Sequence, residues 1–210
     1  MRVSVFCTLI LLLIQTENYG QLKKGEPEYF DAPILMDSLS TLFIPVLYNA
    51  SLFSSEKIAV SGDYYANIIV YDFKVDQYRP LFPRNTFIEP VTITDYYSRG
   101  VTKMRNRTKD LIFFRVKTVD YTGNKRIDEF DPFVLYVSTR NGTNLKRLTP
   151  ENENVAGLEI FEKQGFVLVK LQRDSDGDRS FRAVDNAFYF LKIDLRTLEV
   201  GHPIEISKEL

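Results

Sequence analysis

The sequence has no tryptophan, a single histidine and a single cysteine. Cys7 lies in an apolar N-terminal segment, so the rest of the chain offers no thiol for a disulfide, a thiolate metal site or a covalent intermediate. His202 stands beside Pro203 near the C-terminus, apart from any other candidate residue, which nearly excludes Ser-His-Asp chemistry. No catalytic constellation stands out among the residue types that remain.

Neither sign of charge dominates, because 27 Lys and Arg residues face 28 Asp and Glu residues and the two kinds are interleaved along the chain. A nucleic-acid-binding surface needs a basic face that neutralises phosphates. We therefore expect no nucleic-acid partner. A chain of 210 residues with 44% hydrophobic residues is long enough for one domain with a sizeable core.

The one long apolar run is the stretch 3–14, which follows Arg2 and is too short to span a bilayer. This pattern predicts a signal peptide over residues 1–20, cleaved after Gly20, and a secreted or periplasmic protein. Residues 21–210 are then expected to form a single domain without a transmembrane segment. Since that domain has no disulfide, its stability must come from its core or from a ligand such as a metal ion.

The rest of the chain consists of short runs rich in Val, Ile, Phe and Tyr between turn residues, a pattern that predicts an all-β fold. The predicted strands are 41–48, 57–61, 66–73, 77–82, 86–94, 110–119, 132–139, 144–149, 154–161, 165–173, 187–194 and 199–206.

An acidic stretch, 174–185, has the spacing of a calcium loop. Asp174, Asp176, Asp178 and Asp185 occupy its first, third, fifth and twelfth places. Ca²⁺ takes six to eight oxygen ligands, which these carboxylates and the backbone carbonyl of Ser180 can supply. The stretch resembles an EF-hand loop over these twelve residues alone, because strands rather than helices are predicted on both sides.

Two departures from the EF-hand pattern predict weak binding. Arg179 stands at the sixth place, where the pattern has Gly, and Asp185 replaces a longer glutamate. We expect a Kd of about 10⁻⁴ to 10⁻³ M, the range of extracellular calcium modules. The alternative interpretation is a solvated acidic hairpin loop whose Asp and Gly residues only form turns.

A second loop, 120–131, matches the first place by place, with Asp at the first and twelfth places, Gly at the fourth and a basic residue at the sixth. This agreement predicts an internal duplication. Thr122 and Asn124 replace two of the carboxylates, so here the solvated-loop interpretation is favoured. Its candidate ligands are Asp120, Thr122, Asn124, Asp128 and Asp131.

The duplicated strands and loops predict about three four-stranded repeat units, with Asn141-Gly142 as a hairpin turn in the second. Units of this kind are typical of β-propeller blades. Residues 133–149 (FVLYVSTRNGTNLKRLT) resemble the blade hairpin of TolB-type periplasmic β-propellers, and the resemblance covers mainly residues 110–206. It implies a propeller-like fold that is partial or open, because three blades are fewer than a closed propeller has.

These observations favour a secreted or periplasmic, non-enzymatic scaffold that calcium stabilises and that binds a protein or glycan partner. One alternative is a glycan-directed hydrolase that uses carboxylates, since acidic residues are plentiful. Another is a subunit completed by self-association through its open sheet edges, as a homo-oligomer.

Overall fold

The computed structural model describes residues 29–36, 40–47, 64–89, 93–94, 102–103, 107–125, 127–182 and 184–205. In these ranges the chain is all-β, as predicted, with one turn of 3-10 helix, η2 (Glu162–Gln164). No helix in the described part is long and apolar enough to cross a membrane. The predicted strand at 57–61 and the predicted signal peptide lie outside the described residues.

Most of the strands lie within one to three residues of the predicted ranges. The predicted strand at 86–94 is wrong as a single element, because β6 and β7 occupy its two ends and belong to different sheets. In chain order the strands are β1 (Tyr29–Phe30), β2 (Ile34–Leu35), β3 (Thr41–Leu47), β4 (Tyr65–Asp72), β5 (Gln77–Pro80), β6 (Phe87–Ile88), β7 (Ile93–Thr94), β8 (Thr102–Lys103), β9 (Leu111–Lys117), β10 (Val134–Thr139), β11 (Lys146–Arg147), β12 (Glu153–Phe161), β13 (Phe166–Arg173), β14 (Ala187–Asp194) and β15 (Val200–Ile204).

All pairings are antiparallel. A nine-stranded sheet has the order β1-β3-β4-β6-β9-β10-β11, with β2 on β3 and β5 on β4, and a second sheet has the order β12-β13-β14-β15. Strands β4 and β6 meet only at the pair Tyr65 and Ile88, so the larger sheet consists of two meanders joined at one point. We call β1 to β5 the first unit, β6 with β9 to β11 the second unit, and β12 to β15 the third unit.

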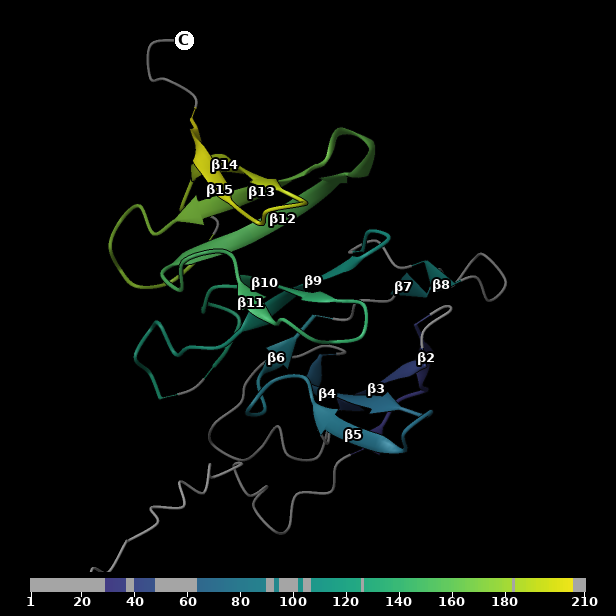
Figure 1. The fold of residues 1–210 in the computed structure, drawn as a ribbon. Helices are drawn as coiled ribbons and strands as arrows, with labels where there is room; N and C mark the ends of the chain where they lie inside the picture. Colours follow the sequence, from purple (N-terminus) through teal and green to yellow (C-terminus); the bar gives the residue numbers. More distant parts are fainter. Residues whose placement is uncertain are drawn as a thin grey trace, which may run out of the picture.

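The three units are stacked in layers, with the third above the second and the second above the first in the view of Figure 1. Strands β7 and β8 form a separate hairpin. The described strands form no closed barrel or ring.

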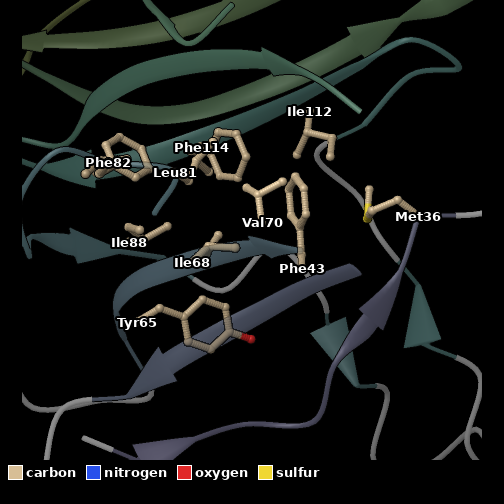
Figure 2. Close-up of a cluster of buried hydrophobic side chains, with 11 residues drawn as sticks. Met36, Phe43, Tyr65, Ile68, Val70, Leu81, Phe82, Ile88, Ile112 and Phe114 are labelled. Carbon is tan, nitrogen blue, oxygen red and sulfur yellow. The ribbon is translucent and has the colours of Figure 1, made fainter. Parts of the chain in front are cut away.

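The second unit is buried on both faces because side chains alternate along β9. Ile112, Phe114 and Val116 pack against Phe43 and Ile68 of the first unit, in the core that Figure 2 shows. Phe113 points the other way, into a core shared with the third unit. The other members of that core are Leu135, Val137, Leu148, Val155, Val167, Val169, Leu171, Tyr189, Leu191 and Ile193.

The second and third units share one strand register. The pairs Ile112–Ser138, Phe114–Tyr136 and Val116–Val134 become Val167–Ile193, Val169–Leu191 and Leu171–Tyr189 when every residue number is raised by 55. The β9 members of the first set face the first unit, and the β13 members of the second set face the second unit. Each of the two units therefore turns the same face toward the unit before it, so the stacking is head to tail.

Candidate metal centre

The 174–185 loop connects β13 to β14, and Asp174 at its first place organises its first half. Asp174 Oδ1 accepts a hydrogen bond from the Gly177 N–H at 2.8 Å, and its Oδ2 accepts one from the Arg179 N–H at 2.9 Å. Both donors have left-handed backbones, with φ of 75° at Gly177 and 62° at Arg179. Arg179 thus adopts a conformation that disfavours side chains with a Cβ, which is why the sixth place of such loops favours glycine.

Asp185 at the twelfth place closes the loop from within the protein, where only 1% of its surface is exposed. Its Oδ1 accepts hydrogen bonds from the N–H and the hydroxyl of Ser175, at 2.9 and 3.1 Å, and its Oδ2 accepts one from the Arg182 N–H at 2.9 Å. The Arg182 N–H, with further help from Ser175, lowers the pKa of Asp185 although burial raises it. The carboxylate is therefore charged at neutral pH.

Three carboxylates converge in this loop. One oxygen each from Asp174, Asp176 and Asp185 lie within 4.8 Å of one another. Charges at this separation repel each other unless a cation lies between them. Each carboxylate has about four lone-pair sites, so the hydrogen bonds described above leave acceptor capacity for a ligand. The three aspartates can hold a metal ion, and an all-oxygen donor set suits a hard cation.

Two of the predicted ligands, Asp178 and Ser180, are not part of this group of three aspartates. Asp178 does not belong to this group, because its Oδ1 accepts a hydrogen bond from the Ser180 N–H at 2.8 Å and its Oδ2 lies 3.7 Å from Arg182 Nη1. Ser180 is buried, and its hydroxyl oxygen has no hydrogen-bond partner. The role predicted for Ser180 uses its backbone carbonyl and stays a prediction.

The 120–131 loop connects β9 to β10, and it repeats the backbone hydrogen bonds and left-handed residues of the 174–185 loop. We call this shared pattern the backbone frame. Asp120 accepts hydrogen bonds from the N–H groups of Gly123 and Lys125, both at 2.7 Å, and these two residues have φ of 76° and 70°. Asp131, 1% exposed, accepts hydrogen bonds from the N–H groups of Tyr121 and Asp128, both at 2.8 Å. The loop places of donors and acceptors are those of the 174–185 loop.

The third and fifth places separate the two loops. The Thr122 hydroxyl donates a hydrogen bond to Asp120 Oδ1 at 3.1 Å, and Asn124 Nδ2 donates one to Asp128 Oδ2 at 2.8 Å. Asp176 and Asp178 stand at the same places of the 174–185 loop, and an ionised carboxylate only accepts hydrogen bonds. Among the described residues, the 120–131 loop contains no group of three acidic side chains within ligand distance.

A buried lysine supplies a second difference, which the sequence analysis missed. Lys117, at the end of β9, is 2% exposed, and its ammonium donates hydrogen bonds to the carbonyls of Glu129, at 3.2 Å, and Asp131. Burial lowers the pKa of Lys117 to about 8, while Asp131 and Asp128 oppose that shift. Lys117 therefore carries its charge at neutral pH and gives the 120–131 loop an internal cation.

Gln172 occupies the equivalent position beside the 174–185 loop, 55 residues further along. Its side-chain amide donates hydrogen bonds to the carbonyls of Arg182 and Asp185, at 3.0 and 2.8 Å. The contact with the carbonyl at the twelfth place matches that of Lys117, whereas the second contact is with the ninth place instead of the tenth, and the amide is neutral. The 174–185 loop thus lacks the buried positive charge that Lys117 provides beside its counterpart.

The two loops also contact each other. The Tyr121 hydroxyl donates a hydrogen bond to Asp174 Oδ2, with 3.2 Å between the two oxygens. The centre of the Tyr121 ring lies 5.5 Å from that of the Phe181 ring. The Phe181 N–H donates a hydrogen bond to the Phe130 carbonyl at 3.0 Å. The order of the 174–185 loop is therefore tied to the contact between the second and third units.

A pocket of about 480 Å³ lies where the first and second units meet, and its lining includes Phe82, Arg84, Tyr136 and Glu151. Glu151 is the only carboxylate among the described residues that line it. Glycoside hydrolysis needs a pair of carboxylates on either side of the substrate. This pocket does not supply such a pair.

Comparison with known proteins adds no assignment to this geometry. The resemblance to TolB-type propellers stays a prediction that rests on residues 133–149. No protein-family model and no curated protein sequence matches the chain.

Proposed function

We propose that the chain is a secreted or periplasmic, non-enzymatic β-repeat scaffold in which Ca²⁺ bound by the 174–185 loop stabilises the third unit against the second. Its surface would serve a protein or glycan partner. The observation that carries this proposal is the contrast between two loops on one backbone frame. The 120–131 loop has the buried Lys117 ammonium beside it and side-chain donors at its third and fifth places. The 174–185 loop has the neutral Gln172 in place of Lys117, and it brings three carboxylate oxygens within 4.8 Å of one another.

The chemistry of the donors favours calcium. Asp174, Asp176 and Asp185 would hold the ion through carboxylate oxygens, which hard cations prefer. Mg²⁺ demands near-ideal octahedral geometry, whereas Ca²⁺ accepts a variable number of ligands in a flexible loop. Asp178 would bind the ion only after its hydrogen bond from the Ser180 N–H and its ion pair with Arg182 break. Breaking these contacts costs part of the binding free energy.

The propeller-like arrangement is supported by the head-to-tail stacking of the four-stranded second and third units. It is also supported by the Asn141-Gly142 turn, where Gly142 has φ of 73° and its N–H donates a hydrogen bond to the Thr139 carbonyl at 2.9 Å. In such a stack each unit covers its neighbour, so a scaffold role follows from how the core is shared. An ion in the 174–185 loop would stabilise one of these junctions, because Asp174 is bonded to Tyr121 of the second unit.

Thermal unfolding with EDTA and with 10 mM CaCl₂ tests the proposal. With a Kd of about 10⁻⁴ to 10⁻³ M, the ion contributes about 1.4 to 2.7 kcal/mol. At about 2 to 4 °C per kcal/mol for a domain of this size, we expect calcium to raise the Tm by about 3 to 11 °C. Asp176→Asn should lose most of this rise, since the amide keeps an oxygen for the Asp178 N–H but removes the charge. Asp110→Asn, an exposed position outside both loops, is the matched control and should keep the full rise.

An unchanged Tm of the wild-type chain on adding calcium would exclude the loop as a stabilising site. An equal rise in the wild type and in Asp176→Asn would assign the ion to another place. Replacing calcium with magnesium should give a smaller rise, because Mg²⁺ demands near-ideal octahedral geometry and dehydrates reluctantly.

A further inference from the structure

The outer face of the third unit is a largely apolar sheet surface on the side opposite to the core that it shares with the second unit. Phe188 and Phe190 on β14 are 39% and 37% exposed, and Ile204, paired with Phe190 on β15, is 54% exposed. Phe166 and Leu168 on β13 alternate with the core residues Val167 and Val169 and so share this outer face. Lys170 and Lys192 share this face and lie over the rings of Phe188 and Phe166. A largely apolar face of this kind marks an interaction surface.

The second unit shows what covers such a face. Its equivalent positions are found by subtracting 55, which turns Leu168, Lys170, Phe188, Phe190 and Lys192 into Phe113, Arg115, Phe133, Leu135 and Val137. Phe113, Leu135 and Val137 are fully buried beneath the third unit. A cation lies over an aromatic ring at both sites. Arg115 Cζ is 4.4 Å from the ring centre of Phe133, and Lys170 Nζ is 4.2 Å from that of Phe188.

In the second unit, Arg115 and Phe133 bind β12, the first strand of the third unit. Arg115 donates hydrogen bonds to the Val155 carbonyl of β12 at 3.2 and 2.8 Å. Phe133 accepts a hydrogen bond from the Val155 N–H at 2.8 Å and donates its own N–H to Asn154 Oδ1 at 2.9 Å. Lys170 and Phe188 present a cation and a strand backbone at the equivalent places. The outer face of the third unit thus offers a binding surface for the first strand of another four-stranded unit.

The opposite end of the stack also has an apolar face. In the first unit Phe43 and Val70 point into the core with the second unit, so Leu42, Ile44, Ile69 and Tyr71 on the same strands point away from it, and all four are partly exposed. Tyr78, paired with Tyr71 on β5, is 76% exposed. In head-to-tail stacking this is the face that a preceding unit covers.

We propose that the third unit of one copy docks its outer face against the first unit of a second copy, and that two such junctions close a dimer. The inference rests on the propeller-like stacking proposed above and does not depend on calcium. The two end faces complement each other because, in the part of the chain that the structure describes, each is without the neighbouring unit that the other can provide. Two copies bring six units into one ring, within the four to eight of closed propellers. A two-fold axis relates the two junctions, so the assembly is closed and leaves no end face exposed.

Sedimentation equilibrium and light scattering on the chain at 5 to 200 µM test the proposal. The wild type should have twice the mass of the chain at high concentration. Phe190→Glu on the outer face of the third unit and Tyr78→Glu on the first unit should each give a monomer, because each change disrupts both junctions. Val75→Glu is the matched control, an apolar residue that is 60% exposed in the β4–β5 turn, and it should stay dimeric.

Mixing the two monomeric variants distinguishes head-to-tail docking from a symmetric contact between two third units. The Phe190→Glu chain keeps an intact first unit and the Tyr78→Glu chain keeps an intact third unit, so the mixture should form a heterodimer through one junction, at least tenfold weaker than the wild-type dimer. A symmetric contact would leave Tyr78→Glu dimeric by itself. Far-ultraviolet circular dichroism must show folded chains in each case.

A wild-type chain that stays monomeric at 200 µM would overturn the proposal, as would a dimer that Phe190→Glu leaves intact. Either result leaves the calcium proposal untouched if calcium still raises the Tm. Conversely, Asp176→Asn should lose the calcium effect and remain dimeric. The two proposals can therefore fail separately.

Discussion

The loops at 120–131 and 174–185 share one backbone frame and differ in how their negative charge is balanced. In both, the aspartates at the first and twelfth places accept N–H groups from the same loop places. In the 120–131 loop the protein itself supplies hydrogen-bond donors to the carboxylates, from Thr122 and Asn124, and a positive charge, from Lys117. The second loop has carboxylates at the third and fifth places and a neutral Gln172 instead. The comparison teaches that one pattern of backbone hydrogen bonds can carry either side chains that offset the negative charge or a group of carboxylates that could hold a metal ion.

The largest effect is expected from removing the shared frame itself. Asp131→Ala and Asp185→Ala each leave three hydrogen-bond donors in or beside a buried site without their acceptor. Unsatisfied buried donors cost about 1 to 3 kcal/mol each, and partial access of water reduces the sum. We expect each variant to lose about 3 kcal/mol in urea unfolding measured with EDTA. If only one of the two changes were costly, the loops would not share a structural role.

The next effect separates the two ways of balancing charge. Gln172→Lys should place an ammonium where Lys117 stands in the other loop, close to the Asp185 carbonyl. Because this charge competes with a bound cation, the calcium-dependent rise in Tm should fall by more than half, although no proposed ligand is altered. Lys117→Gln is the matched control, and calcium should raise its Tm as much as that of the wild type. An unchanged calcium effect in Gln172→Lys would contradict the view that Lys117 replaces an ion.

The strands and the loop duplication could be predicted from the sequence because both are local patterns. A short run rich in aromatic and branched apolar residues predicted β14 at its observed bounds, and the spacing of Asp, Gly and basic residues predicted the two loops. The role of Lys117 could not be predicted, because a lysine at the end of a strand is usually solvated. Asp178 also lay beyond sequence reasoning, since its contacts with Ser180 and Arg182 depend on side-chain directions.

The offset between repeats needed the structure as well. The loops are 54 residues apart, from Asp120 to Asp174, whereas the paired strands are 55 apart. The loop is therefore shifted by one residue relative to its hairpin. Since side chains alternate with period two, the loop alignment alone would assign Phe113 and Val167 to the same face of their units. The strand register shows instead that Phe113 corresponds to Leu168, and this correspondence identifies the outer face of the third unit.

The smallest effect is a pH dependence that belongs to the 120–131 loop alone. The pKa of Lys117 falls from 10.5 to about 8 in the folded protein, chiefly through burial. Between these values the unfolded chain still binds a proton that the folded chain has released, so stability rises with pH, by at most about 1.4 kcal/mol per pH unit. Below pH 8 both states are protonated and the slope vanishes. Gln172 does not titrate, so the 174–185 loop contributes no such slope. From pH 8 to 9, urea unfolding should show the wild type gaining about 1 kcal/mol relative to Lys117→Gln, and parallel profiles would mean that the ammonium is not buried as described.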